Sequence, residues 1–325
     1  WLALARHFLD SRKGGGDPYS QQHKPILEQD KAVGHAVRAN YMYSGMTDIA
    51  ALQSDAGYKS AVEKIWANVV GTKWHITGGC GWNPSGEAYG EDYVLPSNCY
   101  NETCAQVAFL FWTHRMFLLT GEGKYMDAFE RTLYNGALSG VSVSGDRFFY
   151  PNTLEHGGPA ENKPGTTARS PWFGCACCPP NIMRFLASLG QYAYARRGDT
   201  IYVNIYAASH VDIDGFKLAQ RTDYPWSGKI EIAVNGSGNR ALALRVPCWA
   251  VGKPVPSDLY RFGDSGSEKW SVSVDGKDAA PEMKDGYAVI TREWKAGDTV
   301  TVEFPMEARR VVANPNVKEL AGQVA

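Results

Sequence analysis

The sequence predicts an α + β protein with two domains, a helical domain followed by a β-sandwich of the jelly-roll type. The chain has 325 residues, enough for two separate hydrophobic cores. Apolar residues recur at helical spacing in the first part, and the pattern changes to strand-like stretches after Gly198. We therefore expect the helical domain over residues 1–197 and the sandwich over residues 198–325.

Six stretches of the first part have apolar residues every three or four positions, as helices do. Glycine ends the first of them at Gly14 and the fourth at Gly121, where a helix commonly stops. Pro179 and Pro180 open the last one, and proline is well tolerated in a first helical turn. The expected helices cover residues 1–13, 30 onward, 57–70, 102–120, 123–138 and 180–196.

The second part contains short stretches rich in Val, Ile and Thr, with turn residues between them, which is typical of strands in a sandwich. The pattern stops partway at the end of the chain, so we expect the sandwich to be incomplete. The expected strands cover residues 200–206, 229–234, 241–246, 271–274, 287–290 and 299–304.

Charge and hydropathy exclude two classes of partner. The formal net charge is −1 and no basic run is present, whereas nucleic-acid binding needs clustered Lys and Arg. No run of about 18 apolar residues occurs, so the sequence predicts no transmembrane helix. We expect neither nucleic acid nor a membrane as a partner, and a homo-oligomer stays open.

The start of the chain carries no targeting signal. Trp1 lies inside the first expected helix without an initiator Met or a signal peptide, so we expect the N-terminal part of the protein to be missing. Seven cysteines, an odd number with several clustered, fit a metal site better than a disulfide framework. This composition favours a reducing, cytoplasmic location.

Aromatic residues are frequent, with ten Trp and seventeen Tyr, many of them in loops rich in Gly and Pro. Flat aromatic faces in loops suit a carbohydrate-binding cleft, where they stack on sugar rings. Large aromatic residues also dominate ordinary protein cores. Composition alone therefore does not distinguish a sugar-binding cleft from an aromatic-rich core.

The strongest candidate for chemistry is the cysteine-rich segment Cys175-Ala176-Cys177-Cys178-Pro179-Pro180-Asn181. Adjacent cysteines do not easily form a disulfide with each other, because their Cα atoms lie about 3.8 Å apart. Soft metals prefer sulfur ligands, and zinc accepts thiolates together with a carboxylate in tetrahedral geometry. Buried reduced thiols acting as small hydrophobic side chains are the alternative. A full zinc site would consist of Glu102, Cys104, Cys177 and Cys178.

A long irregular segment over residues 74–100 is the second candidate for function, because loops of this length inside compact domains are usually functional. It contains the acidic residues Glu87, Glu91 and Asp92. These side chains could transfer protons, and they could equally be ordinary solvated loop charges.

Five short motifs in this order resemble glycoside hydrolase family 127, which includes β-L-arabinofuranosidases. The resemblance covers essentially the whole chain and implies an (α/α)6 barrel followed by β-sandwich domains. The expected helices would fill only part of such a barrel, so we expect a central fragment of a longer enzyme. The motifs are Gly34-His35-Ala36-Val37-Arg38-Ala39, His75-Ile76-Thr77-Gly78-Gly79, Gly86-Glu87-Ala88-Tyr89-Gly90, Glu102-Thr103-Cys104-Ala105 and Cys177-Cys178-Pro179-Pro180-Asn181.

The resemblance also implies roles for individual residues. The family's zinc ligands fall on Glu102, Cys104, Cys177 and Cys178. Its cysteine nucleophile falls on Cys177, its general acid/base on Glu87, and its substrate contacts on His35 and Tyr150. His75, in a glycine-rich stretch, is a further candidate for the wall of the cleft.

The implied activity is that of a retaining glycoside hydrolase that releases L-arabinofuranose from plant-type glycans. Retaining enzymes ordinarily use two carboxylates, and here a zinc-held thiolate would replace the nucleophilic one. Two alternatives stay open. Glu87 could pair with Glu91 or Asp92 beside a purely structural zinc, or the chain could be a catalytically inactive sugar-binding module.

Overall fold

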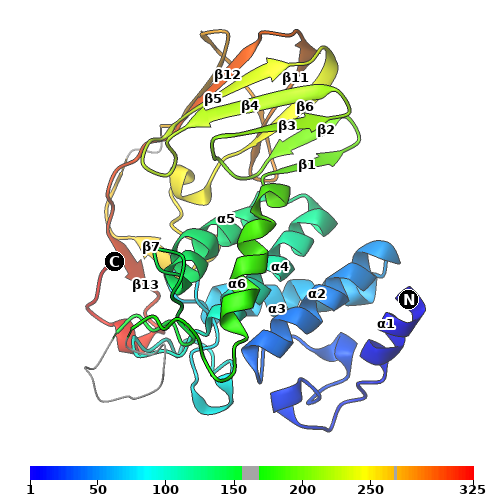
Figure 1. The fold of residues 1–325 in the computed structure, drawn as a ribbon, viewed down its shortest axis with the longest axis vertical. Coiled ribbons are helices and arrows are strands. Elements are labelled where there is room, and N and C mark those ends of the chain that lie inside the picture. Colours follow the sequence, from blue (N-terminus) through cyan, green and yellow to red (C-terminus); the bar gives the residue numbers. More distant parts are fainter. Residues whose placement is uncertain (156–167, 267–268) are drawn as a thin grey trace.

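The computed structural model describes residues 1–155, 168–266 and 269–325. A helical part comes first in the chain and a β-sandwich follows it, as Figure 1 shows. This arrangement confirms the predicted fold class. Across the described ranges, no helix is both long enough and apolar enough to cross a membrane.

The helical part is built around α4, which is apolar on nearly all sides and is therefore buried. It packs against α2, α5 and α6. Asp55 caps the start of α3 by accepting hydrogen bonds from two backbone N–H groups, and Gly121 ends α4 with a positive φ of 81°. The α-helices are α1 (Leu2–Asp10), α2 (Ala36–Leu52), α3 (Ala56–Thr72), α4 (Thr103–Thr120), α5 (Gly123–Arg131) and α6 (Cys178–Ala187).

Three helices end earlier than their apolar spacing predicts, and the first of them, α1, stops at Asp10. The helix expected from residue 30 begins only at Ala36. α6 stops at Ala187, and after a 3₁₀ turn the chain forms the first strand, because residues 194–197 pair with the strand that follows. α5 stops at Arg131 and continues as a π-helical turn over Thr132–Ala137 and a 3₁₀ turn over Leu138–Gly140. Helical periodicity alone does not distinguish these turns from an α-helix.

The sandwich consists of a five-stranded sheet in the order β1-β2-β6-β11-β10 and a six-stranded sheet in the order β3-β4-β5-β12-β8-β9. Among the described residues, the paired strands of these two sheets are antiparallel, except that β2 runs parallel to β6. The inner faces share one apolar core, to which β6 contributes Leu242 and β5 contributes Ile232. The strands are β1 (Tyr194–Arg197), β2 (Thr200–Val203), β3 (Ser209–Ile213), β4 (Phe216–Thr222), β5 (Lys229–Asn235), β6 (Gly238–Arg245), β8 (Ser271–Val274), β9 (Lys277–Asp278), β10 (Glu282–Lys284), β11 (Tyr287–Trp294) and β12 (Thr299–Glu303).

A buried ion cluster joins the two parts of the molecule. Arg245, at the end of β6, has no exposed side-chain surface and donates to Asp127 Oδ1 over 2.7 Å and to Glu130, both on α5. A small sheet of β7 (Tyr260–Phe262) and β13 (Val311–Ala313) lies beside the helices rather than in the sandwich (Figure 1). The chain therefore returns twice to the helical part after the sandwich has begun.

Candidate active site

Two helix N-termini meet at the predicted cysteine cluster. Glu102 directly precedes α4 and Cys104 lies in its first turn, while Cys177 directly precedes α6 and Cys178 is its first residue. The two helices pack against each other. Helix N-termini favour negative charge, so thiolates and a carboxylate are well placed at this junction.

The four predicted ligand residues are brought together. Sγ of Cys177 lies 3.5 Å from Oε1 of Glu102, and Sγ of Cys178 lies 3.6 Å from the same oxygen. The two sulfur atoms are 3.8 Å apart. One ligand atom each from Glu102, Cys104, Cys177 and Cys178 can be chosen so that all lie within 4.8 Å of one another, and the cluster could therefore bind a metal ion.

The carboxylate of this cluster lacks a full set of partners. Oε2 of Glu102 is buried, and no described residue forms a hydrogen bond with it. Burial, with the nearby Cys177 and Glu87, raises the pKa of Glu102 to about 9. A buried acidic group beside three thiols is unfavourable as an anion unless a positive charge compensates it, and a metal ion would supply that charge.

The two adjacent cysteines differ in exposure. Cys178 is fully buried, whereas Cys177 is half-buried and is the one of the pair open to a ligand. Hydrogen bonds with the Cys104 and Cys178 thiols lower the pKa of Cys177 well below that of a free thiol. Burial, with the Cys104 contact next, raises the pKa of Cys178. Cys177 is therefore the better candidate for a reactive thiolate.

Tyr150 contacts Cys177. Its hydroxyl oxygen lies 3.3 Å from Sγ of Cys177 and 4.0 Å from Sγ of the exposed Cys175. The Phe173 ring packs edge-on against the Tyr150 ring, with centroids 5.6 Å apart, and this contact orients it. The Tyr150 hydroxyl is thus held against the half-buried Cys177 thiol.

Glu87 lies next to the cysteine cluster. One carboxylate oxygen of Glu87, one of Glu102 and one ring nitrogen of His35 lie within 4.8 Å of one another. Nε2 of His35 is 3.0 Å from Oε2 of Glu87, and the hydroxyl of Tyr100 donates to Oε1 over 2.8 Å. Burial lowers the pKa of His35, although the neighbouring Glu87 carboxylate acts to raise it. The lowered pKa favours a neutral His35 ring.

The backbone around Glu87 is unusual. Gly86 has a φ of 72° and Glu87 itself a φ of 51°, a left-handed conformation that non-glycine residues adopt only at a cost. Two β-bridges hold the adjacent Ala88, one to His35 and one to Asn83. Such strained residues cluster at functional sites, where the surrounding structure holds a side chain in one position.

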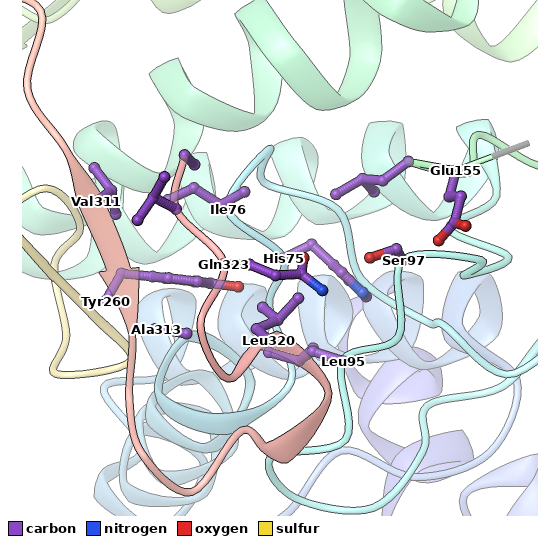
Figure 2. A pocket seen from close by; sticks show the side chains of 13 residues that line it. His75, Ile76, Leu95, Ser97, Glu155, Tyr260, Val311, Ala313, Leu320 and Gln323 are labelled. Carbon is purple, nitrogen blue, oxygen red and sulfur yellow. The ribbon is translucent and has the colours of Figure 1, made fainter.

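His75 lies apart from this cluster. Its side chain is buried, with Nδ1 3.1 Å from the Asn101 amide and Nε2 3.2 Å from the carbonyl oxygen of Pro96. It lines a cavity of about 290 Å³ with Leu95 and Tyr260 (Figure 2), and none of the four cysteine-cluster residues lines that cavity. Its position in a glycine-rich stretch reflects this buried packing, so the structure does not bring His75 to the predicted cleft wall.

The two other candidate acids have different surroundings. Asp92 binds Lys31 over 2.6 Å, Lys73 over 3.1 Å and the Asn68 amide over 2.9 Å, so it ties the long loop to α3. Glu91 is exposed. Neither residue belongs to the groups of converging ligand atoms found among the described residues.

Tyr100 is one of two site residues that the sequence did not reveal. It precedes Glu102 by two positions, and its contact with Glu87 depends on the folding of the intervening loop. Tyr19 was missed as well. Its ring packs edge-on against His35 at 5.6 Å, and the Arg38 guanidinium lies 4.9 Å from its centroid.

Comparison with known protein families matches both parts of the chain. Residues 1–191 match the model of the β-L-arabinofuranosidase GH127 catalytic domain, and residues 200–306 match that of the GH127 middle domain. The non-reducing end β-L-arabinofuranosidase of Bifidobacterium longum subsp. longum is 33% identical over 322 residues, which cover 94% of this chain and 46% of that protein.

Solved structures agree with this match. A GH127 β-arabinofuranosidase superposes with a TM-score of 0.94 and 47% identity over 100% of this chain and 51% of its own. A GH127 β-L-arabinofuranosidase from Geobacillus stearothermophilus T6 superposes with a TM-score of 0.88 and 37% identity, over 100% of this chain and 54% of its own. The chain spans about half the length of these relatives. The motifs, the fold and both family models agree, and the chain belongs to glycoside hydrolase family 127.

Proposed function

We propose that the protein is a retaining glycoside hydrolase that releases L-arabinofuranose from plant-type glycans, with Cys177 as nucleophile and Glu87 as general acid/base. The half-exposed Cys177 thiol, in a cluster of three cysteines and Glu102 and beside Glu87, carries this proposal. Family membership and relatives named as β-L-arabinofuranosidases support the choice of sugar.

We propose zinc as the metal of the cluster. With Zn–S bonds of about 2.3 Å and a Zn–O bond of about 2.0 Å, a tetrahedral site places two sulfurs about 3.8 Å apart and a sulfur and an oxygen about 3.5 Å apart. The Cys177 and Cys178 sulfurs are 3.8 Å apart, and each lies 3.5–3.6 Å from Oε1 of Glu102. These spacings fit tetrahedral ligation, and the unpartnered Glu102 Oε2 is consistent with it.

Zinc bound by these ligands would keep the sulfur atoms deprotonated at neutral pH. The first chemical step then forms a bond between Sγ of Cys177 and the anomeric carbon, while the bond from that carbon to the leaving oxygen breaks. Glu87 gives its proton to the leaving oxygen in the same step. Tyr150 is close enough to Sγ of Cys177 to orient it.

The second step restores the enzyme. Glu87, now a carboxylate, takes a proton from a water molecule, and the water oxygen bonds to the anomeric carbon as the carbon–sulfur bond breaks. The electron pair of that bond returns to Cys177 as a thiolate. Two displacements at one carbon retain the anomeric configuration. We propose that His35 and Tyr150 contact the sugar, because His35 lies against Glu87 and Tyr150 lies against Cys177.

The alternative of a carboxylate pair has less support. Asp92 is held by Lys31, Lys73 and Asn68, and Glu91 is an exposed loop residue outside the cluster.

We also propose a catalytic helical domain over residues 1–197, as part of a larger (α/α)6 barrel, and a sandwich domain over residues 198–325. Reduced cysteines at the site favour a cytoplasmic location.

The proposed activity is tested by hydrolysis of a chromogenic β-L-arabinofuranoside by the full-length enzyme. We expect release of the chromophore, its loss in Cys177→Ser, and its retention in Cys175→Ser, because Cys175 lies outside the ligand cluster. A serine hydroxyl is scarcely ionised and is a poorer zinc ligand. Sugar binding without any hydrolysis would identify a binding module instead.

A further inference from the structure

Tyr100 is held rigidly beside the proposed acid/base. Its hydroxyl donates to Oε1 of Glu87 over 2.8 Å. Its backbone N–H donates to the carbonyl oxygen of Trp82 over 2.7 Å, and its own carbonyl oxygen accepts from the N–H of Asn152 over 2.9 Å. The Tyr150 ring packs edge-on against it, with centroids 6.4 Å apart. These contacts fix where the Tyr100 hydroxyl points.

The two oxygens of Glu87 therefore have different surroundings. Oε1 accepts the Tyr100 hydroxyl, while Oε2 faces Nε2 of His35 at 3.0 Å. A carboxylic acid carries its proton on one oxygen. Oε1 already accepts a hydrogen bond from the Tyr100 hydroxyl and is the less favourable place for the proton, whereas Nε2 of a neutral His35 ring can accept a hydrogen bond from a protonated Oε2. The proton of Glu87 is thus directed to Oε2, the oxygen beside His35.

We propose that Tyr100 is a positioning residue that selects Oε2 of Glu87 as the oxygen that donates and accepts the catalytic proton. This inference rests on the proposed function of Glu87. Glu87 lies on an irregular loop and has a left-handed backbone conformation, so its side chain needs a fixed contact outside its own segment. Tyr100 supplies that contact at Oε1, and Oε2 stays directed toward His35, the residue proposed to contact the sugar.

Replacing Tyr100 by Phe in the full-length enzyme tests this role, because the ring and its packing against Tyr150 are kept and only the hydroxyl is lost. Glu87 could then hold its proton on either oxygen. We expect kcat/KM for an alkyl β-L-arabinofuranoside, a poor leaving group that needs protonation, to fall about ten- to a hundredfold. For a nitrophenyl β-L-arabinofuranoside, which leaves without protonation, we expect less than about a threefold change.

Two controls separate this inference from a structural effect and from the proposed function. Zinc content and the unfolding midpoint of Tyr100→Phe should match those of the parent enzyme, and Tyr194→Phe, which removes a hydroxyl bonded to Ser209 in the sandwich, should leave both substrates unaffected. Glu87→Gln should show the leaving-group dependence more strongly. The role of Tyr100 is wrong if Glu87→Gln shows the leaving-group dependence but Tyr100→Phe does not. Tyr100→Phe would then either lose the same activity on both substrates or keep full activity on both. If Glu87→Gln itself shows no such dependence, the proposed function of Glu87 fails.

Discussion

Oε1 of Glu102 lies 3.5 Å from Sγ of Cys177, although 75 positions of the chain separate the two residues. The contact joins the start of α4 to the start of α6. A metal ion at this point would therefore cross-link two helices and close a long loop between them, which stabilises the folded state relative to the unfolded chain.

Removal of zinc should destabilise the protein. We expect about one zinc ion per chain by elemental analysis and a lower unfolding temperature after chelation. Cys104→Ser should lower zinc content and stability more than Cys248→Ser, because Cys248 lies outside the ligand cluster. Native protein without metal and with freely titratable thiols at Cys104, Cys177 and Cys178 would contradict the metal site.

Loss of the Glu87 carboxyl should affect catalysis rather than folding. Glu87→Gln keeps the shape of the side chain and removes its exchangeable proton, so hydrolysis of poor leaving groups should slow by about 10²–10⁴-fold. Activated aryl substrates should be affected less in the first step. Steady-state kinetics on both substrate types measure this, with the exposed Glu91→Gln as control. Near-normal turnover of a poor leaving group would assign proton transfer to another acid.

Asp92 should contribute stability that depends on pH. Burial opposes its ionisation, but hydrogen bonds from Lys31 and Asn68 outweigh burial and lower the pKa of Asp92. Its contribution is therefore present above the unfolded pKa of about 3.9 and is lost as pH falls below that value. Asp92→Asn should reduce the free energy of unfolding by about 1–2 kcal/mol at pH 7 and by less near pH 3.

Urea unfolding at both pH values measures this difference. Asp30→Asn is the matched control, because the ion pair of Asp30 with Lys24 is exposed and contributes at most about 1 kcal/mol. If the loss of unfolding free energy caused by Asp92→Asn were larger at pH 3 than at pH 7, the predicted pH dependence would be wrong.

Arg245 should be essential to the joint between the helices and the sandwich. Arg245→Met removes the partner of Asp127 and Glu130 and leaves two nearly buried carboxylates uncompensated. We expect a loss of about 3–5 kcal/mol in the free energy of unfolding, measured with denaturant. Arg292→Met, at a partly exposed ion pair, should cost at most about 1 kcal/mol. Similar losses in both variants would show that the buried cluster is not special.

Sequence reasoning predicted those parts of the structure that local patterns determine. The helical first part and the sandwich followed from apolar periodicity, and the convergence of Glu102 with the cysteines followed from their chemistry and from the family motifs. The early end of α6 was not predictable, because residues 194–197 form a strand only by pairing with β2. Tertiary contacts of this kind outweigh helical spacing.

The same limit applies within the site. His75 belongs to a family-like motif, yet its ring is buried against Asn101 and Pro96. Tyr100 belongs to none of the motifs, yet it contacts Glu87. Sequence adjacency also could not distinguish Cys177 from Cys178, whose difference in exposure arises from the packing of α6. The direction in which a side chain points is determined by tertiary packing, which these local sequence patterns do not contain.

The identity of the nucleophile is the central claim, and covalent labelling tests it most directly. The full-length enzyme is treated with a haloacetamide derivative of L-arabinose whose electrophile lies at the anomeric position, and the modified peptide is mapped by mass spectrometry. We predict a single label on Cys177, prevented by excess L-arabinose and absent in Cys177→Ser. A label on Glu87 or Glu91, with Cys177 and Cys178 both unmodified, would contradict the account and identify a two-carboxylate glycosidase with a structural metal.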